Sequence, residues 1–588
     1  MSMNNNFVFQ LIVLTGLSVL GPIGVPCSGV ESVDAETKRQ QIWEGPLDVG
    51  GVVLRLRFEI TMEEDGGFSG HLISLDQGNV KVPLSGMSVD GDEVEMEFKS
   101  IGGKFVGKRD KDNQEVVGRW TQYGNGFDYS IKRADAEPPR KHTETWQGIL
   151  DAGQREFDFQ LRIQVDEKGK QYAVLDSFSE RKLDLPTEFE ATDDGFSFRL
   201  PFIKAGFSGK YNADRTTIAG EWQQVGKLPL ELEKIPIEAT RFSLEKRKRP
   251  QHPTEPYPYT VTEVTFRNEA DDVELAGTLT IPKTSEGKKR FPAVVLVTGS
   301  GPQDRDETLF EHKPFLVIAD HLTRKGIAVL RYDDRGVGAS SGQFQGATTE
   351  DFARDAESGI DFLRKHDRID SEKVGIVGHS EGGVIGPMIA ARSDDVAFVV
   401  MLAGPGVDGA KISTSQSRAM SETAGMSAAY LDTQEEALMG VIKKIKQEKK
   451  PLTEEQIDAV LEKIASQSEE KKSYIHLMAS AIKNLTDPWM TNYLMSDPSH
   501  DLCKVKCPVL ALYGEKDLQV LPELNAKAVQ KHLTTAGNQD FKTVELARLN
   551  HLFQTAESGQ ITEYGEIEET FAPAALELIS EWILPRTK

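Results

Sequence analysis

Residues 374–391 read VGIVGHSEGGVIGPMIAA, and this stretch decides the fold of the C-terminal half of the chain. An apolar run ends at Val377, the pentapeptide Gly-His-Ser-Glu-Gly follows at 378–382, and small apolar residues come after it. The pattern predicts a buried strand, a tight turn centred on Ser380, and a helix. In that context G-x-S-x-G is typical of a nucleophile elbow, whose strained turn exposes the serine hydroxyl. The alternative is a serine in an ordinary tight turn.

A nucleophilic serine needs a general base and a carboxylate that orients this base. Asp517 follows the apolar run PVLALYG, and His551 follows the candidate strand FKTVELA. The order Ser, Asp, His is typical of α/β hydrolases. We therefore predict a catalytic triad of Ser380, Asp517 and His551, with Asp408 after the run FVVMLAG as the fallback acid. In the alternative interpretation, Asp517 only caps a turn and His551 lies on the surface.

Acyl transfer also requires hydrogen-bond donors for a tetrahedral oxyanion. Glu381 follows the predicted nucleophile and supplies one backbone N–H. The second donor is expected in the glycine-lined turn after the strand PAVVLVTG, with Ser300 as the first candidate and Gly301 as the next. The neighbouring run 304–307, Asp-Arg-Asp-Glu, is predicted to be a salt-bridged loop rather than part of the catalytic machinery.

Apolar runs alternate with helical patterns from about residue 259 onward. This alternation predicts a doubly wound, mostly parallel α/β sheet, with LAGTLTIP near Leu275 as an antiparallel edge strand. Residues 408–500 interrupt it with a helical insertion, in which Thr453-Glu454-Glu455-Gln456 is a capping box. We expect this insertion to cap Ser380. Some of its residues are candidates for an acyl pocket, although packing of the cap's own core is favoured for most: Met420, Met426, Tyr430, Met478, Trp489 and Tyr493.

A repeat with a period of about a hundred residues precedes this region. WEGPLDVGGVVLRLRFEI from Trp43 matches WQGILDAGQREFDFQLRI from Trp146, and GRWTQYG matches GEWQQVG. Apolar and polar residues alternate within each copy, which predicts half-buried antiparallel strands and a small all-β barrel or sandwich. The matched tryptophans are interpreted as fillers of matched cores. The alternative is a platform that binds glycan or lipid.

Residues 7–25, FVFQLIVLTGLSVLGPIGV, form an apolar run that is typical of a secretory signal peptide, although the leading segment MSMNNN lacks the usual Lys or Arg. We therefore expect export to the periplasm or the extracellular space after cleavage, with an N-terminal anchor as the minority interpretation. No second run is long enough to span a bilayer, so no integral membrane span is expected in the mature chain. The net charge of −23 disfavours nucleic acid as a partner. No metal or organic cofactor is expected.

The motifs together resemble esterase D-like carboxylesterases, a bacterial branch of the α/β-hydrolase superfamily related to serine aminopeptidase-type and prolyl oligopeptidase-type hydrolases. The motifs that carry this resemblance are GSGPQDRDE, RYDDRGVGAS, GHSEGG, CPVLALYGEKDLQV and NHLFQTAESGQITEYGEIEET. The resemblance implies a Ser-His-Asp esterase mechanism with these roles on Ser380, His551 and Asp517. We predict an exported serine hydrolase that acts on a small-molecule ester of short to medium acyl chain. A peptidase with the same triad, or a glycan- or lipid-binding protein with a vestigial hydrolase domain, are the alternatives.

The resulting fold class is multidomain: two N-terminal all-β repeats followed by an α/β-hydrolase domain that carries a helical cap insertion. The expected boundaries are a signal peptide at 1–35, β repeats at 36–138 and 139–245, a Pro-rich linker at 246–260, and the catalytic domain at 261–588 with its insertion at 408–500.

Overall fold

The computed structural model describes residues 40–587 apart from short internal segments. These segments are 50–51, 64–66, 76–79, 99–100, 102, 111–113, 123–124, 135–139, 152–155, 180–181, 204, 225, 238, 240–247, 284–289 and 484–487. The predicted signal peptide at 1–35 also lies outside the described residues. The chain divides between Lys246 and Arg247 into two compact units.

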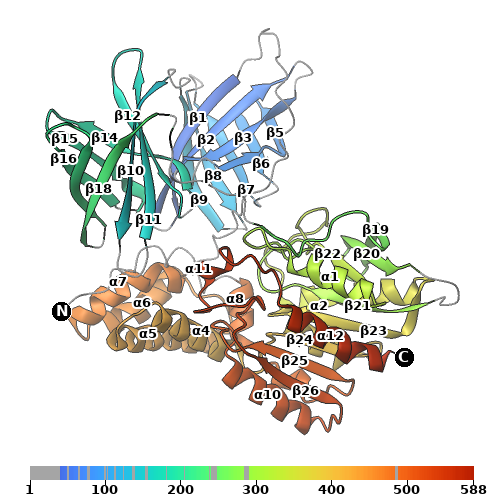
Figure 1. The fold of residues 1–588 in the computed structure, drawn as a ribbon. Helices are drawn as coiled ribbons and strands as arrows, with labels where there is room; N and C mark the ends of the chain where they lie inside the picture. The colour runs from blue at the N-terminus through green and yellow to red at the C-terminus, as the bar shows by residue number, and fades with distance from the viewer. Residues whose placement is uncertain are drawn as a thin grey trace. The chain divides into compact units, whose positions relative to one another are not determined.

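The first repeat is one antiparallel sheet of nine strands, in the order β4-β3-β2-β1-β9-β8-β7-β6-β5 (Figure 1). The alternation that predicted strands is visible along β2, where Leu56, Phe58 and Ile60 are buried and the residues between them are partly exposed. The strands are β1 (Gln40–Val49), β2 (Val52–Met62), β3 (Phe68–Ser74), β4 (Val80–Pro83), β5 (Gly86–Asp90), β6 (Glu93–Phe98), β7 (Gly103–Arg109), β8 (Glu115–Gln122) and β9 (Asn125–Ala134).

The second repeat has the same arrangement, in the order β13-β12-β11-β10-β18-β17-β16-β15-β14. Trp146 and Trp222 are buried in its core, as Trp43 and Trp120 are in the first, so the interpretation of the matched tryptophans as core residues is confirmed. The elements are β10 (Arg140–Asp151), β11 (Glu156–Asp166), β12 (Gln171–Ser177), β13 (Lys182–Pro186), β14 (Glu188–Ala191), β15 (Gly195–Leu200), a short 3₁₀ helix (Pro201–Ile203), β16 (Ala205–Tyr211), β17 (Thr217–Gln223) and β18 (Lys227–Ile235).

Each repeat is a half-barrel rather than the barrel or sandwich that the strand pattern predicted. A sandwich would need two sheets, whereas one sheet contains all nine strands of each repeat. The physical reason is that a twisted sheet can curl over the large side chains of its own inner face. In the first repeat the ring of Phe58 lies 5.8 Å from that of Phe98 and 6.3 Å from that of Trp120.

The second unit contains an eight-stranded sheet in the order β19-β20-β22-β21-β23-β24-β25-β26. The pairs from β22 to β26 are parallel, and β19 and β20 are antiparallel. The prediction that LAGTLTIP forms the edge strand is wrong, because β19 pairs along its outer side. The strands are β19 (Tyr259–Asn268), β20 (Val273–Pro282), β21 (Phe291–Val297), β22 (Ala328–Tyr332), β23 (Ile369–His379), β24 (Val399–Leu402), β25 (Val509–Gly514) and β26 (Phe541–Leu546).

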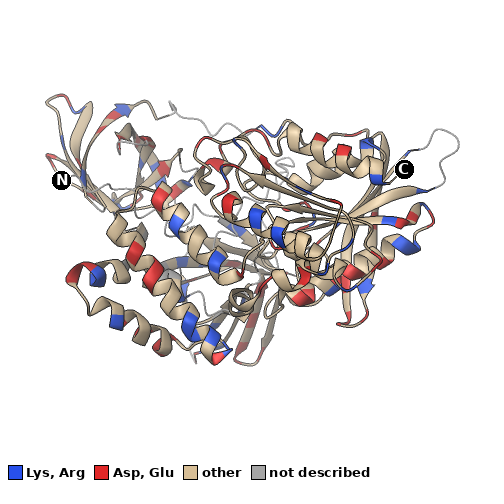
Figure 2. Ribbon diagram, turned by 90° about the horizontal axis from the view of Figure 1, so that it is seen from below, with Lys and Arg blue, Asp and Glu red and all other residues tan. Residues whose placement is uncertain are grey.

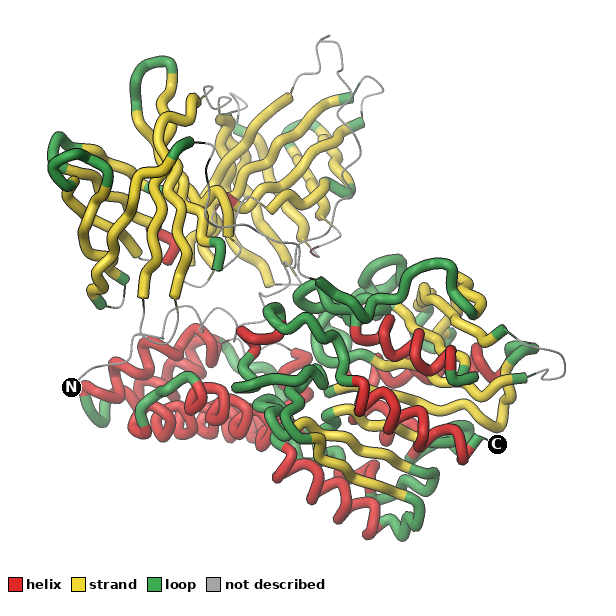
Figure 3. The backbone as a smooth tube through the Cα atoms, in the orientation of Figure 1, coloured by secondary structure: helices red, strands yellow, loops and turns green. Residues whose placement is uncertain are grey.

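Helices connect these strands and pack on the sheet (Figure 3). Those that alternate with the strands are α1 (Pro314–Arg324), α2 (Thr349–Lys365), α3 (Gly382–Ala390) and α10 (Pro522–Thr535), and α11 (Ile561–Tyr564) and α12 (Pro573–Arg586) follow the last strand. Six more are inserted between β24 and β25: α4 (Gly409–Thr423), α5 (Ala428–Glu448), α6 (Glu454–Ala465), α7 (Glu469–Lys483), α8 (Pro488–Met495) and α9 (Ser499–Leu502). The predicted capping box opens α6, where Thr453 and Gln456 bond reciprocally. Acidic and basic residues are interspersed along the helices (Figure 2).

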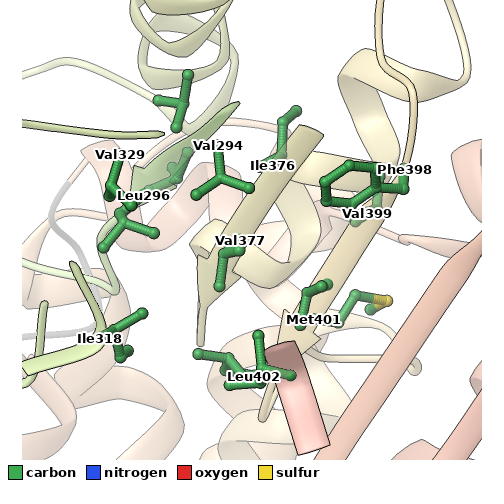
Figure 4. Close-up of a cluster of buried hydrophobic side chains, with 14 of the residues drawn as sticks. Val294, Leu296, Ile318, Val329, Ile376, Val377, Phe398, Val399, Met401 and Leu402 are labelled. Atoms are coloured by element: carbon green, nitrogen blue, oxygen red, sulfur yellow. The ribbon is translucent and has the colours of Figure 1, made fainter. Parts of the chain in front are cut away.

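The core of this unit explains why its strands are almost continuously apolar. Successive residues of a strand point to opposite faces, and both Ile376 and Val377 of β23 are fully buried (Figure 4). Ile318 of α1 and Phe398 belong to the same core. Burial on both faces fixes the sheet rigidly, so the residues at the ends of its strands are held in defined positions. None of the described helices is both long and apolar enough to cross a membrane.

Candidate active site

Ser380 occupies the sharp turn between β23 and α3. Its φ of +50° lies in the left-handed region, which a residue with a side chain adopts only at a cost. The two flanking glycines are sterically required, because a Cβ on Gly378 would lie 2.0 Å from the carbonyl oxygen of Gly382, and one on Gly382 would lie 2.2 Å from that of Val297. The pentapeptide therefore adopts the strained turn that the sequence predicted.

His551 and Asp517 are brought together from the loops that follow β26 and β25. His551 Nδ1 lies 2.8 Å from Asp517 Oδ2, and both side chains are buried. Asp517 Oδ1 accepts hydrogen bonds from the backbone N–H groups of Gln519 (2.8 Å) and Val520 (2.9 Å). These bonds orient the carboxylate, and the carboxylate orients the imidazole with a proton on Nδ1, which leaves Nε2 as an acceptor.

The loop of His551 lies against the turn that carries Ser380. His379 Nε2 lies 3.0 Å from the main-chain oxygen of His551, and the two imidazole rings are 4.8 Å apart. Among the described residues, the Ser380 hydroxyl has no hydrogen-bond partner. Hydrogen bonds between a nucleophile and its base often tighten only when substrate binds. The structure thus brings the three predicted triad residues into one region of the sheet's edge.

The glycine turn after β21 also lies against Ser380. A Cβ built on Gly299 would lie 3.2 Å from the Cβ of Ser380. Within the described part of the chain, neither the backbone N–H of Ser300 nor that of Glu381 donates to a protein acceptor. Both of the N–H groups predicted for the oxyanion are therefore uncommitted. The hydroxyl of Ser300 is occupied, because it hydrogen-bonds the carboxyl group of Glu381.

The carboxyl group of Glu381 is buried and has only neutral hydrogen-bond donors around it. Oε1 accepts from Thr349 Oγ1 at 2.6 Å and from Trp489 Nε1 of α8 at 3.1 Å, and Ser300 is the third donor. Burial raises the pKa of Glu381, and the three hydrogen bonds only partly counteract this shift. The sequence analysis used only the backbone of Glu381, so this junction between the turn and the insertion was missed.

The predicted salt-bridged loop at 304–307 is confirmed in part. Arg305 pairs with Asp333 at 2.8 Å, and Asp306 pairs with Lys313 at 3.1 Å. Glu307 differs, because its Oε1 lies 2.8 Å from Nδ1 of His379. Sequence reasoning missed both residues of this last pair. The available signal was His379 itself, a titratable side chain inside the pentapeptide.

Asp408, the fallback acid, has a different role in the structure. Its Oδ1 accepts from the backbone N–H of Lys411 at 3.3 Å, which caps α4, and lies 3.4 Å from Lys446 Nζ. These contacts leave Asp517 as the carboxylate beside His551. Within the residues that the structure describes, no group of three His, Cys, Asp or Glu side chains is arranged to hold a metal ion.

The family model described as X-Pro dipeptidyl-peptidase (S15 family) matches residues 271–551. Esterase EstD of Thermotoga maritima is 29% identical over 283 residues, which cover 48% of this chain and 59% of that protein. The chain therefore matches about six-tenths of the length of this relative.

Solved structures with detectable similarity include two esterases. The Pyrococcus furiosus esterase Pf2001 is 14% identical, with a TM-score of 0.35, and the match covers 58% of this chain and 99% of that one. Est1E from Butyrivibrio proteoclasticus is 15% identical, with a TM-score of 0.32, and the match covers 55% and 98%. The family match and the Thermotoga relative confirm the resemblance to α/β-hydrolase esterases that the motifs predicted.

Proposed function

We propose that the second unit is a serine hydrolase that cleaves carboxylic esters of short to medium acyl chain. Ser380 is the nucleophile, His551 the general base and acid, and Asp517 the residue that orients His551. The backbone N–H groups of Glu381 and Ser300 form the oxyanion hole. The substrate is a small-molecule ester, and the reaction requires no cofactor.

One observation carries this proposal: a strained serine, a His–Asp pair and two uncommitted backbone donors meet at one edge of the sheet. Any one of these features has an ordinary structural explanation. Their combination is what acyl transfer requires, because the nucleophile, the base and the oxyanion donors must all lie within reach of one carbonyl group. The energetic cost of a φ of +50° at Ser380 also favours a functional explanation over a structural one.

The reaction follows from the positions of these groups. His551 Nε2 takes the proton of the Ser380 hydroxyl as its oxygen attacks the ester carbonyl, and the two N–H groups stabilise the negative oxygen. The tetrahedral intermediate collapses, and His551 returns the proton to the departing alcohol. Water then attacks the acyl-enzyme with His551 again as the base, which releases the acid and regenerates Ser380.

The inserted helices supply the proposed cap and the acyl pocket. Trp489 of α8 bonds Glu381, which is adjacent to the nucleophile, and the ring of Trp489 stacks on that of Tyr493 at 5.5 Å. These two stacked rings, one of which is bonded to the residue that follows the nucleophile, offer an apolar wall to an acyl chain. This placement favours a pocket role for these two candidates from the sequence.

A peptidase with the same triad is the second candidate, and the match to the S15 family favours it. The chemistry at the carbonyl group is the same for an ester and an amide, so the shape of the pocket decides between them.

Export of the protein also remains a prediction, because it depends on residues 1–35.

The test compares wild type with Ser380→Ala on p-nitrophenyl acetate, butyrate and octanoate, and on a series of amino-acyl p-nitroanilides. We expect ester turnover that Ser380→Ala lowers by about ten-thousand-fold or more. Faster turnover of the anilides than of the esters would support the peptidase. Equal and slow turnover by both proteins on every substrate would contradict the triad.

A further inference from the structure

His379, the residue before the nucleophile, has a hydrogen-bond acceptor at each of its ring nitrogens. Nδ1 lies 2.8 Å from Glu307 Oε1, and Nε2 lies 3.0 Å from the main-chain oxygen of His551. A carbonyl oxygen and an ionised carboxylate only accept hydrogen bonds. Both nitrogens must therefore carry a proton, which makes the ring an imidazolium paired with the Glu307 carboxylate.

This ion pair joins three segments of the candidate site. Glu307 Oε1 also accepts the backbone N–H of Gly299 at 2.8 Å, and Gly299 precedes the proposed oxyanion donor Ser300. On the other side, His379 Nε2–H donates to the carbonyl oxygen of His551. The backbone of His551 is thus held at its carbonyl group.

The pair is isolated from water, with 8% of the His379 side chain and 6% of the Glu307 side chain exposed. Burial alone would lower the pKa of His379. The charge and hydrogen bond of Glu307, the His551 carbonyl and the more distant Asp517 carboxylate outweigh burial, so the pKa is raised above the ordinary histidine value. The charged or titratable groups around His379 are the carboxylates of Glu307 and Asp517 and the imidazole ring of His551.

We propose that the Glu307–His379 ion pair positions the general base His551 and the oxyanion turn at Gly299 and Ser300, and that it does so only while His379 carries both protons. The proposal rests on the proposed function. Both members are positioning residues, because they act through His551 and Gly299 rather than on the substrate.

The direction of the pH dependence follows from the raised pKa of His379. A group whose pKa is higher in the folded state contributes its full stabilisation below its unfolded value, near 6.5, and loses it as the pH rises through the folded value. When His379 loses one of its two ring protons, either the Glu307 carboxylate or the His551 carbonyl oxygen faces a nitrogen lone pair of the ring instead of an N–H donor. The value of kcat should therefore fall at alkaline pH.

Glu307→Gln tests the charge with little change in shape. The amide oxygen can still accept the N–H of Gly299, but the negative charge that raises the pKa of His379 is lost. We expect the alkaline fall in kcat to move to lower pH by about one unit or more. The KM for p-nitrophenyl butyrate should stay within about twofold of wild type, because orientation rather than substrate binding is changed.

Two amide variants of His379 separate its two contacts. The amide nitrogen of asparagine occupies the place of Nδ1, so His379→Asn keeps a donor for Glu307 and loses the contact with His551. The longer His379→Gln places its amide nitrogen near Nε2 and keeps the contact with His551. We expect kcat to fall about tenfold to a hundredfold in His379→Asn, and His379→Gln to recover part of that loss.

Asp355→Asn is the matched control, because it removes the charge of another buried ion pair of the same unit, Arg335–Asp355 at 2.6 Å. It should lower the midpoint of thermal unfolding without moving the alkaline limb of kcat. The positioning role is wrong if Asp355→Asn shifts this limb as much as Glu307→Gln does, or if the Glu307 and His379 variants match wild type in kcat at every pH.

Labelling of Ser380 by a fluorophosphonate separates this proposal from the proposed function. If Ser380 is not labelled in the wild type, or if Ser380→Ala retains turnover, the proposed function fails and the positioning role fails with it. If labelling and turnover depend on Ser380 but the pH profiles of the Glu307 and His379 variants are those of wild type, only the positioning role is overturned.

Discussion

At the scale of single residues, Asp517 carries the sharpest prediction. Its Oδ2 accepts the Nδ1 proton of His551, and this contact selects the imidazole tautomer that leaves Nε2 free to act as a base. Asp517→Asn preserves the shape of the side chain but lets it present an N–H donor to the ring. We expect kcat on p-nitrophenyl butyrate to fall by about ten-thousand-fold. Steady-state kinetics and thermal unfolding of the same preparations measure the effect.

Asp408→Asn is the control for this substitution, because Asp408 is also a carboxylate that follows a strand of the sheet. It caps α4, a role that asparagine fills about as well, and lies near the partly exposed Lys446, so the substitution should cost about 1 kcal/mol of stability or less and leave kcat unchanged. A large loss of kcat in Asp408→Asn together with little loss in Asp517→Asn would reverse the assignment of the acid.

At the scale of elements, helix α8 connects the insertion to the turn that carries Ser380. Trp489→Phe keeps an aromatic ring but removes the Nε1 donor to Glu381, so the pKa of Glu381, already raised by burial, should rise further. A lost hydrogen bond of about 1 kcal/mol corresponds to about a fivefold effect. We expect kcat/KM to fall by about that factor for p-nitrophenyl octanoate, and by less for the acetate, because only the longer chain reaches the insertion.

Tyr474→Phe, on α7 of the same insertion, removes a hydroxyl that contacts Glu470 and should leave the acyl-chain profile unchanged. An identical drop for acetate and octanoate in Trp489→Phe would argue against an acyl pocket beneath α8. It would then favour a role for Trp489 in holding Glu381 alone.

At the scale of the whole molecule, the two units have separate hydrophobic cores. Every residue placed in the candidate site lies between Arg247 and Lys588. A shortened chain of residues 247–588 should therefore fold and retain kcat/KM for p-nitrophenyl butyrate within about threefold of the full chain. Kinetics of both lengths, each beside its own Ser380→Ala variant, test this. A loss above about tenfold in the shortened chain, with its thermal unfolding transition intact, would assign the half-barrels a part in catalysis.

The sequence by itself determined the features that local patterns encode. Period-two alternation predicted the strands around Phe58, and continuous apolar runs predicted the buried strands of the second sheet. The glycines around Ser380 predicted the strained turn, because no other residue fits where a Cβ would lie about 2 Å from a carbonyl oxygen. The positions of Asp517 and His551 followed from the rule that loops at one edge of a parallel sheet gather functional residues.

Only the tertiary structure decided which side chains meet. Glu307 and His379 are 72 residues apart, and Glu381 and Trp489 are 108 apart, so no local pattern links them. The same holds for the curl of each β repeat into a half-barrel, because alternation reports which face is buried but not whether a second sheet or the same sheet covers it. Periodicity records the burial of each residue separately, whereas pairing and curvature depend on how distant segments pack, and that packing is decided by the whole chain at once.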